Sequence, residues 1–267
     1  MAKQFKNYLG ALLKGEDLSS SEMSSLMNLI MTGELSSAQI ASCIVAMQIK
    51  GETPDEIAAA ASVMREHANK VIVEDSKYLI DTCGTGGDSL QTFNISTLSA
   101  IIAAAAGAKV AKHGGRSVSS KCGSADVLEV LGVNVNLDHK RLGQLVDAIG
   151  IGFMFAPNYH PAMKYVAPVR KELEIRTMFN LLGPLTNPAS AKRQIVGVYS
   201  KELTITFARV LQKLGSEHVL VVHGEDGMDE ISITGKTFIA ELKDNVIKEY
   251  TIEPSLFKLK AGSLKDI

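Results

Sequence analysis

From about residue 75 onward, the chain alternates short apolar runs with longer helical stretches, and this alternation constrains its fold more than any other feature. It predicts an α/β layer with a mainly parallel sheet, because a helix between two strands lets them pair in the same direction. The last two apolar runs flank Asp244 and Asn245, which predicts an antiparallel edge hairpin. The predicted strands cover 78–81, 109–111, 151–155, 194–199, 218–222, 236–242 and 246–252, with helices near 96–106, 124–131, 138–149 and 202–214.

The first 70 residues predict a smaller, all-helical unit. Ser19 and Ser36 each stand three residues before a Glu or Gln, which is the spacing of a helix capping box. Thr53 precedes a proline and predicts a further helix start. Residues 158–190 are again helical and interrupted by prolines, so we expect them to return to this unit. The expected domains are therefore 1–73 with the return segment of about 158–190, and 74–157 with 191–267.

Composition argues against several classes of protein. The chain has 28 Lys and Arg against 29 Asp and Glu, and its net charge of −1 argues against a protein that binds nucleic acid through a basic excess. Three widely spaced cysteines without a CxxC pair disfavour a zinc site or a disulfide framework. No apolar signal core or membrane-length apolar run is present. We expect a soluble, cytoplasmic protein with no membrane partner.

Two glycine-rich segments follow predicted strands, and both suit an anionic ligand. The segment 84–88, Gly-Thr-Gly-Gly-Asp, comes after the strand predicted to end at Asp81, and a helix start is predicted at 94–97. Backbone N–H groups of such a turn and the positive end of the next helix can hold phosphate. The segment 112–124 combines three cations, four hydroxyl-bearing side chains and three glycines, which suits a pyrophosphate better than a plain connection.

A third segment adds an acidic pair. Asp229 and Glu230 follow the strand predicted at 218–222, and adjacent carboxylates are hard ligands of the kind that hold Mg²⁺ beside a phosphate. In open α/β sheets ligands gather at the carboxyl ends of the strands, where all three segments are expected. The residues alone therefore predict an enzyme that uses Mg²⁺ on a pyrophosphorylated substrate.

The order of these motifs resembles the anthranilate phosphoribosyltransferase family of tryptophan biosynthesis. The resemblance rests on Asp-Thr-Cys-Gly-Thr-Gly-Gly-Asp at 81–88, Asn-Ile-Ser-Thr at 94–97, the segment 112–120, Gly-Ser-Ala-Asp at 123–126 and Asn-Leu-Leu-Gly-Pro-Leu-Thr-Asn-Pro at 180–188. It implies a helical domain joined to an α/β domain, and a homodimer formed through the helical domain. It also implies a Mg-dependent glycosyltransferase that moves the 5-phosphoribosyl group of phosphoribosyl pyrophosphate to anthranilate, giving N-(5-phosphoribosyl)anthranilate and pyrophosphate.

The resemblance also implies residue roles and two Mg²⁺ ions per monomer. Lys112, Asp229 and Glu230 would support the chemistry, and Ser96, Asp229 and Glu230 would hold metal. Gly84 and Arg170 would contact anthranilate. The phosphoribosyl pyrophosphate contacts would be Gly87, Asp88, Thr92, Asn94, Ile95, Ser96, Thr97, Lys112, His113, Gly114, Gly115, Arg116, Ser117, Val118, Ser119, Ser120 and Ser124.

The sequence departs from the family pattern at a few positions. Gly115 stands where the family usually has an Asn that touches anthranilate, so a hydrogen-bonding side chain is lost there. Cys122 replaces a usual Ser, Glu174 replaces a usual Gly, and the family pattern predicts further helices after Ile267. Of these differences, Gly115 keeps open a paralogue that uses another aromatic acceptor, or one that binds nucleic acid without catalysis. A nucleoside phosphorylase of the same fold is disfavoured by the intact segment 115–120 and the acidic pair.

Overall fold

The computed structural model describes residues 2–88, 90, 92–116 and 122–266. Its first 66 residues form four helices, and the capping boxes expected at Ser19, Ser36 and Thr53 are all present. Each cap side chain accepts a hydrogen bond from the backbone three residues on, which satisfies a donor that the helix leaves unpaired. The helices are α1 (Ala2–Leu13), α2 (Ser20–Met31), α3 (Ser37–Lys50) and α4 (Pro54–Glu66).

The remainder is built around one seven-stranded sheet. Its strand order is β3-β2-β1-β4-β5-β6-β7, and the first five strands are parallel. The last two pair antiparallel and form the predicted edge hairpin. The strands are β1 (Ile80–Gly84), β2 (Val110–Gly114), β3 (Ile151–Phe155), β4 (Arg193–Gly197), β5 (His218–Gly224), β6 (Thr237–Lys243) and β7 (Val246–Ile252).

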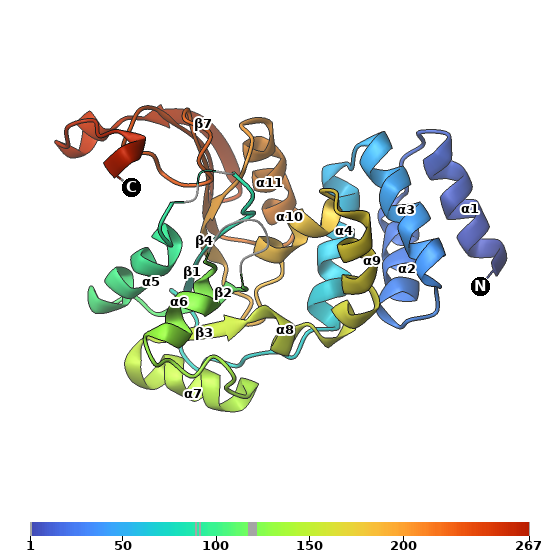
Figure 1. The fold of residues 1–267 in the computed structure, drawn as a ribbon, viewed down its shortest axis with the longest axis horizontal. Helices are drawn as coiled ribbons and strands as arrows, with labels where there is room; N and C mark the ends of the chain where they lie inside the picture. Colours follow the sequence, from blue (N-terminus) through green and yellow to red (C-terminus); the bar gives the residue numbers. More distant parts are fainter. Residues whose placement is uncertain (1, 89, 91, 117–121, 267) are drawn as a thin grey trace.

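Helices cover the sheet on both faces. One face carries α5 (Ile95–Ala105), which contacts β1 and β2, and the other carries α11 (Glu202–Lys213), which contacts β5 and β6 and also α4 (Figure 1). Figure 1 also shows the helical part to the right of the sheet, with the return segment beside it. The return segment begins within α8 (Ala156–Tyr159) and holds a 3₁₀ turn (Pro161–Tyr165), α9 (Ala167–Leu173) and α10 (Met178–Leu185). The other elements are α6 (Ser124–Val130), α7 (His139–Ile149) and 3₁₀ turns at Pro254–Phe257 and Leu264–Asp266.

The expected ends of the first two strands were wrong. The sequence placed them at Asp81 and Ala111, before the polar and glycine residues, but the strands continue to Gly84 and Gly114. Pairing with the neighbouring strands is the reason, because Gly84 pairs with β4 and Gly114 pairs with β3. The residues that carry charge and hydroxyl groups therefore begin inside the rigid sheet and not in the loops after it.

A single hydrophobic core joins the helical part to the sheet. It runs from α1–α4 through α9 and α10 to α11 and the apolar side chains of β4–β6. Met23, Met27 and Met47 are fully buried in it, where their flexible side chains fill the space between the helices. No helix in the described part of the chain is both long and apolar enough to cross a bilayer.

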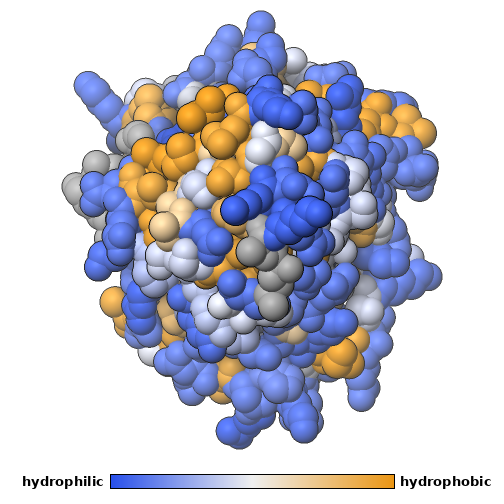
Figure 2. Space-filling model, turned by 90° about the vertical axis from the view of Figure 1, so that its right-hand side faces the viewer, coloured by the Kyte–Doolittle hydropathy of each residue, from blue (hydrophilic) through white to orange (hydrophobic). Residues whose placement is uncertain are grey.

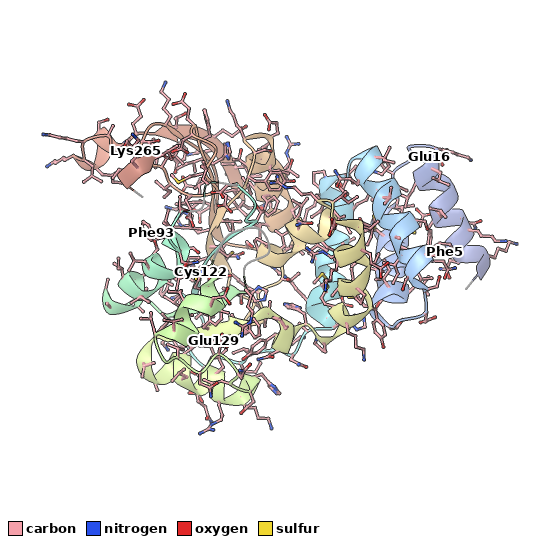
Figure 3. All side chains as sticks on the ribbon, viewed as in Figure 1. Phe5, Glu16, Phe93, Cys122, Glu129 and Lys265 are labelled. Carbon is pink, nitrogen blue, oxygen red and sulfur yellow. The ribbon has the colours of Figure 1, made fainter. Side chains whose placement is uncertain are left out.

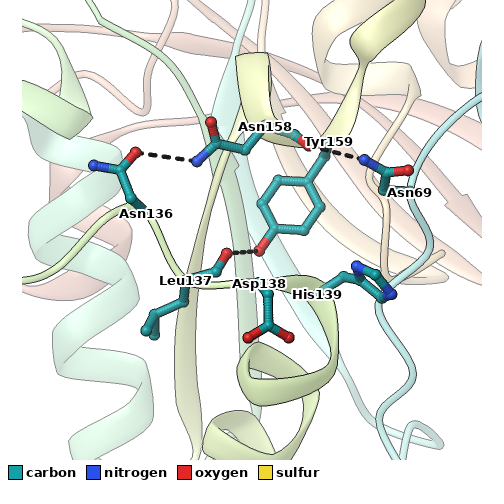
Figure 4. Close-up of a pocket in the computed structure, with 7 residues that line it drawn as sticks. All are labelled: Asn69, Asn136, Leu137, Asp138, His139, Asn158 and Tyr159. Carbon is teal, nitrogen blue, oxygen red and sulfur yellow. Dashed lines mark hydrogen bonds between the residues drawn. The ribbon is translucent and has the colours of Figure 1, made fainter.

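The chain passes between the helical part and the α/β part three times, and the three crossings touch. The Asn69 backbone N–H donates to the carbonyl of Tyr159 at 2.9 Å, and the Val71 N–H donates to the carbonyl of Pro188 at 3.1 Å. Beside the first two crossings lies a polar cavity of about 370 Å³ (Figure 4). Its lining is tied by side-chain hydrogen bonds from Asn69 to the Asn158 carbonyl, from Asn158 to Asn136, and from the Tyr159 hydroxyl to the Leu137 carbonyl.

Candidate active site

The strand order reverses between β1 and β4, and the candidate site lies at their carboxyl ends. β1 connects through α5 to β2 on one side, whereas β4 connects through α11 to β5 on the other. The two connections leave in opposite directions and open a crevice at this point, which is where ligands bind in sheets of this kind. Gly84 and Gly197 end the two strands and pair with each other.

Asp229 lies directly against both glycines. Its Oδ2 accepts a hydrogen bond from the backbone N–H of Gly86 at 2.7 Å. A Cβ built on Gly84 would lie 2.6 Å from that oxygen, and one built on Gly197 would lie 1.4 Å from the Asp229 carbonyl oxygen. The two strand ends therefore have to be glycine for the acidic pair to reach the crevice. Gly86 and Gly87 also have positive φ values of 66° and 80°, which only glycine adopts without strain.

The acidic pair is half-buried, and its two carboxylates repel each other. Burial and the neighbouring Asp88 carboxylate raise the pKa of Asp229, although the Gly86 N–H opposes the shift. Burial and the Asp229 carboxylate raise the pKa of Glu230 to about 8, although Lys112 and the Ser96 backbone oppose this shift. Half-buried carboxylates that raise each other's pKa in this way are stabilised in their charged form by a bound cation.

The donor set at this point fits Mg²⁺. It consists of carboxylate oxygens and the nearby Ser96 hydroxyl, which accepts a hydrogen bond from Lys112. Mg²⁺ prefers hard oxygen donors of this kind. The described residues contain no group of three or more His, Cys, Asp or Glu side chains arranged to hold a metal by themselves. That arrangement suits an ion that keeps waters and shares its coordination with substrate phosphates.

Lys112 is a cation placed inside the sheet and not on a loop. It lies on β2 with 3% of its surface exposed, and its Nζ donates to the carbonyl of Thr82 and to the Ser96 hydroxyl, the latter at 3.1 Å. Burial lowers its pKa, and the charges of Asp81 and Glu230 oppose this shift. Lys112 therefore brings positive charge to the same region as Glu230, beside Ser96.

The loops after β1 and β2 lie side by side. The Asn94 side chain donates to the carbonyl of Cys122 at 3.0 Å, and the Thr97 hydroxyl donates to the Ser124 hydroxyl at 2.8 Å. Figure 3 labels Phe93 and Cys122 in these two loops, at the left of the sheet. The start of α5 and the start of α6 therefore share one hydroxyl-lined region, in which Thr92 and Ile95 also lie.

Sequence reasoning missed His160, which pairs with the predicted His113. Their rings are tilted, with centroids 5.1 Å apart, and both side chains are buried. The His113 Nδ1–H donates to the carbonyl of Gly183 at 3.2 Å, which leaves Nε2 as the acceptor of a neutral ring. Neither Nε2 has a hydrogen-bond partner among the described residues. The His-Pro turn at 160–161 of the return segment was the available signal, but nothing in its spacing linked it to β2.

The other predicted residues fall in different places. Arg170 lies near the end of α9, and its side chain forms no hydrogen bond or ion pair with another described residue, while burial lowers its pKa. Arg116 is exposed and pairs with Asp126 at 2.8 Å and with Glu129 at 2.6 Å, on α6 and not in the crevice. Gly115 lies directly after β2. Ser117, Val118, Ser119 and Ser120 lie outside the described residues.

Two protein-family models match this chain. Residues 6–68 match the glycosyl transferase family, helical bundle domain, and residues 76–267 match the glycosyl transferase family, a/b domain. An anthranilate phosphoribosyltransferase of Chromobacterium violaceum is 57% identical over 97% of this chain and 76% of its own length. One from Thiobacillus denitrificans is 58% identical over 94% of this chain and 74% of its own.

Solved structures agree with the sequence relatives. Anthranilate phosphoribosyltransferase from Thermus thermophilus superposes with a TM-score of 0.91 at 44% identity, over 97% of this chain and 77% of that one. The Saccharomyces cerevisiae enzyme in complex with PRPP and Mg also has a TM-score of 0.91, at 31% identity, over 99% of this chain and 77% of that one. The expected fold, a small helical bundle and a larger α/β layer, is thereby confirmed.

Proposed function

The chain belongs to the anthranilate phosphoribosyltransferase family, and from this premise we propose how its residues perform that family's reaction. The reaction transfers the 5-phosphoribosyl group of phosphoribosyl pyrophosphate to the anthranilate amine and releases pyrophosphate. One observation carries the proposal. The acidic pair, the glycine loop 84–88 and Lys112 come from three different strands and meet at the crevice between β1 and β4.

We propose that this crevice takes the pyrophosphate and ribose end of the substrate. Asp229 and Glu230, with Ser96, would hold two Mg²⁺ ions there together with substrate oxygens. Bound Mg²⁺ supplies positive charge to the departing pyrophosphate. Lys112 and the backbone N–H groups of the loop 84–88 would stabilise the same charge and fix the leaving group in line with the anomeric carbon. A strong nucleophilic side chain is unnecessary, because the amine of the acceptor attacks.

The acceptor side of the site would lie between β2 and the return segment. The Nε2 atoms of His113 and His160 have no partner among the described residues, and the Nε2 of His113 is an acceptor that can hold the N–H of the anthranilate amine. Arg170 would pair with the anthranilate carboxylate, since a guanidinium matches a carboxylate with two hydrogen bonds. Both histidines stay neutral at pH 7, because burial lowers their pKa values to about 3 and about 4.

We further propose that the chain forms a homodimer through its helical domain, comprising 1–73 with 158–190. Leu13 at the end of α1 and Ile49 at the end of α3 expose 71% and 82% of their surface. Figure 2 shows the end of the molecule that this part forms, with apolar areas among the polar ones. Sedimentation at micromolar concentration tests the assembly, and a purely monomeric chain would overturn it.

The test of the function is the loss of anthranilate fluorescence with each component omitted in turn. We expect consumption only when the chain, phosphoribosyl pyrophosphate and Mg²⁺ are all present. Replacing Asp229 and Glu230 together by Ala should remove most of the Mg²⁺-dependent turnover, and full activity in that variant would exclude the acidic pair from the site. No consumption by the unaltered chain, with other aromatic amines accepted, would identify a different acceptor.

A further inference from the structure

We propose that Arg176 is a positioning residue that holds the glycine loop 84–88 in the orientation that binds pyrophosphate. This inference rests on the proposed function. Arg176 lies between α9 and α10, in the return segment. Its guanidinium donates to the backbone carbonyl of Gly87 and also stacks on the ring of Tyr199, 4.2 Å from the ring centroid. The contact therefore joins the helical part of the molecule to the phosphate loop.

The loop is held from two sides, and Tyr199 takes part in both. The Tyr199 backbone N–H donates to the Thr85 hydroxyl at 3.2 Å, and the Thr85 N–H donates to the carbonyl of Gly197 at 2.9 Å. These bonds fix the first half of the loop to β4. Arg176, stacked on the same tyrosine, fixes the second half through Gly87. Because a planar guanidinium can stack and donate at once, Arg suits this position better than Lys.

Holding the Gly87 carbonyl sets the direction of the next amide. A trans peptide is planar, and its C=O and N–H point in opposite directions. The guanidinium on the Gly87 carbonyl oxygen therefore makes the Asp88 N–H point the opposite way, within the same peptide plane. Gly87 has a φ of 80° and no Cβ to restrict rotation, so its own conformation does not fix this plane. An anion site built from backbone N–H groups depends on that direction.

A side chain at Gly87 would meet the same guanidinium. A Cβ built there would lie 3.1 Å from the Arg176 Nη2 atom. The close approach between loop and arginine thus needs glycine on one partner and a flat cationic group on the other. Since Arg176 belongs to the return segment, the loop is correctly oriented only when that segment lies against the end of the sheet.

The test compares Arg176→Ala and Arg176→Lys with the unaltered chain. Calorimetry with phosphoribosyl pyrophosphate and Mg²⁺, without anthranilate, should show a dissociation constant raised about 10- to 100-fold in Arg176→Ala, the effect of losing a charge-assisted hydrogen bond. Arg176→Lys should recover only part of this affinity, because an ammonium cannot stack as a guanidinium does. The KM for phosphoribosyl pyrophosphate should rise much more than the KM for anthranilate. Millimolar guanidinium should restore part of the affinity to Arg176→Ala, because it can occupy the space on Tyr199.

The matched control is Lys164→Ala. Lys164 is also a cation stacked on a tyrosine of the return segment, 4.9 Å from the ring centroid of Tyr165, but it has no contact with the described part of the glycine loop. We expect unchanged substrate affinity in this variant. Equal rises in both KM values for Arg176→Ala, or a loss that matches Lys164→Ala, would overturn the inference. Inactivity of the unaltered chain would instead contradict the proposed function, so the two failures are distinguishable.

Discussion

Gly115 shows at the scale of one residue how a departure from the family pattern can be tested. A Cβ built at this position meets no atom of the described residues within 4 Å, and its backbone is not in the left-handed region. We therefore expect Gly115→Asn to change the free energy of unfolding by less than about 0.5 kcal/mol. The new amide should lower the KM for anthranilate and leave the KM for phosphoribosyl pyrophosphate unchanged. Steady-state kinetics by anthranilate fluorescence measures both.

Gly197 is the opposite case and serves as the comparison for that variant. Here a Cβ would overlap the Asp229 carbonyl oxygen, so Gly197→Ala should displace the acidic pair or prevent folding. Two glycine substitutions near one site should thus differ sharply in thermal stability. Similar stability in both variants would contradict the packing described at the β1 and β4 ends. An unchanged KM for anthranilate in Gly115→Asn would mean that the acceptor does not reach this position.

At the scale of the element, the loop between β5 and β6 carries the acidic pair and is organised by Asp226. One Asp226 oxygen accepts hydrogen bonds from the hydroxyls of Ser232 and Thr234, both at 2.5 Å, and the other accepts from the Met228 N–H at 3.1 Å. In Asp226→Asn, an NH₂ group would replace one of these acceptors. We expect a several-fold rise in the Mg²⁺ concentration that gives half-maximal rate, with kcat recovered at high Mg²⁺.

Glu225→Gln is the control for this element. Glu225 is exposed on the same turn, and within the described part of the chain its carboxylate makes one hydrogen bond, a 3.4 Å contact with the Lys236 N–H. Titration of the rate with Mg²⁺ should give the unaltered half-saturation in this variant. The same Mg²⁺ requirement in Asp226→Asn and Glu225→Gln would show that the hydroxyl contacts do not place the acidic pair.

The existence of the elements was predictable, but their mutual placement was not. Capping spacing located the starts of α2, α3 and α4, because these signals are local. The ends of β1 and β2 were misplaced, because pairing with distant strands carries polar residues such as Lys112 into the sheet. His160 and Arg176 could not be assigned, since each acts through a partner far away in sequence, His113 in one case and Gly87 in the other.

At the scale of the whole molecule, the two buried histidines sit where the sheet meets the return segment, and they predict an acid sensitivity. Their folded-state pKa values, about 3 and about 4, lie below the usual 6.5. Below that value the unfolded chain binds protons that the folded chain does not, so the free energy of unfolding should fall as pH drops from 7 toward 4. Denaturant titration at a series of pH values measures this.

The same experiment can separate the contribution of the histidines to the pH dependence of stability from that of the carboxylates. His160→Gln removes one of the two groups and should flatten the profile between pH 6.5 and 4, a window set by the usual and folded-state pKa values. His139→Gln replaces an exposed histidine that lines the polar cavity beside the crossings, and it should leave the profile unchanged. A profile in His160→Gln as steep as in the unaltered chain would show that other groups cause the acid sensitivity.

The order of the strands also bears on how the chain matures on the ribosome. The interior strand β1 is the first to be synthesised, yet one of its two neighbours, β4, emerges only after β2, β3 and the whole return segment. Likewise α3 and α4 contact α9 and α10, which come much later. Domains fold as units from the N-terminus during synthesis. Here neither the helical part nor the α/β part can complete its fold early, because each needs residues that are synthesised late. A nascent chain halted before Arg193 would keep apolar helix faces and an open strand edge exposed, and would be a natural client for chaperones.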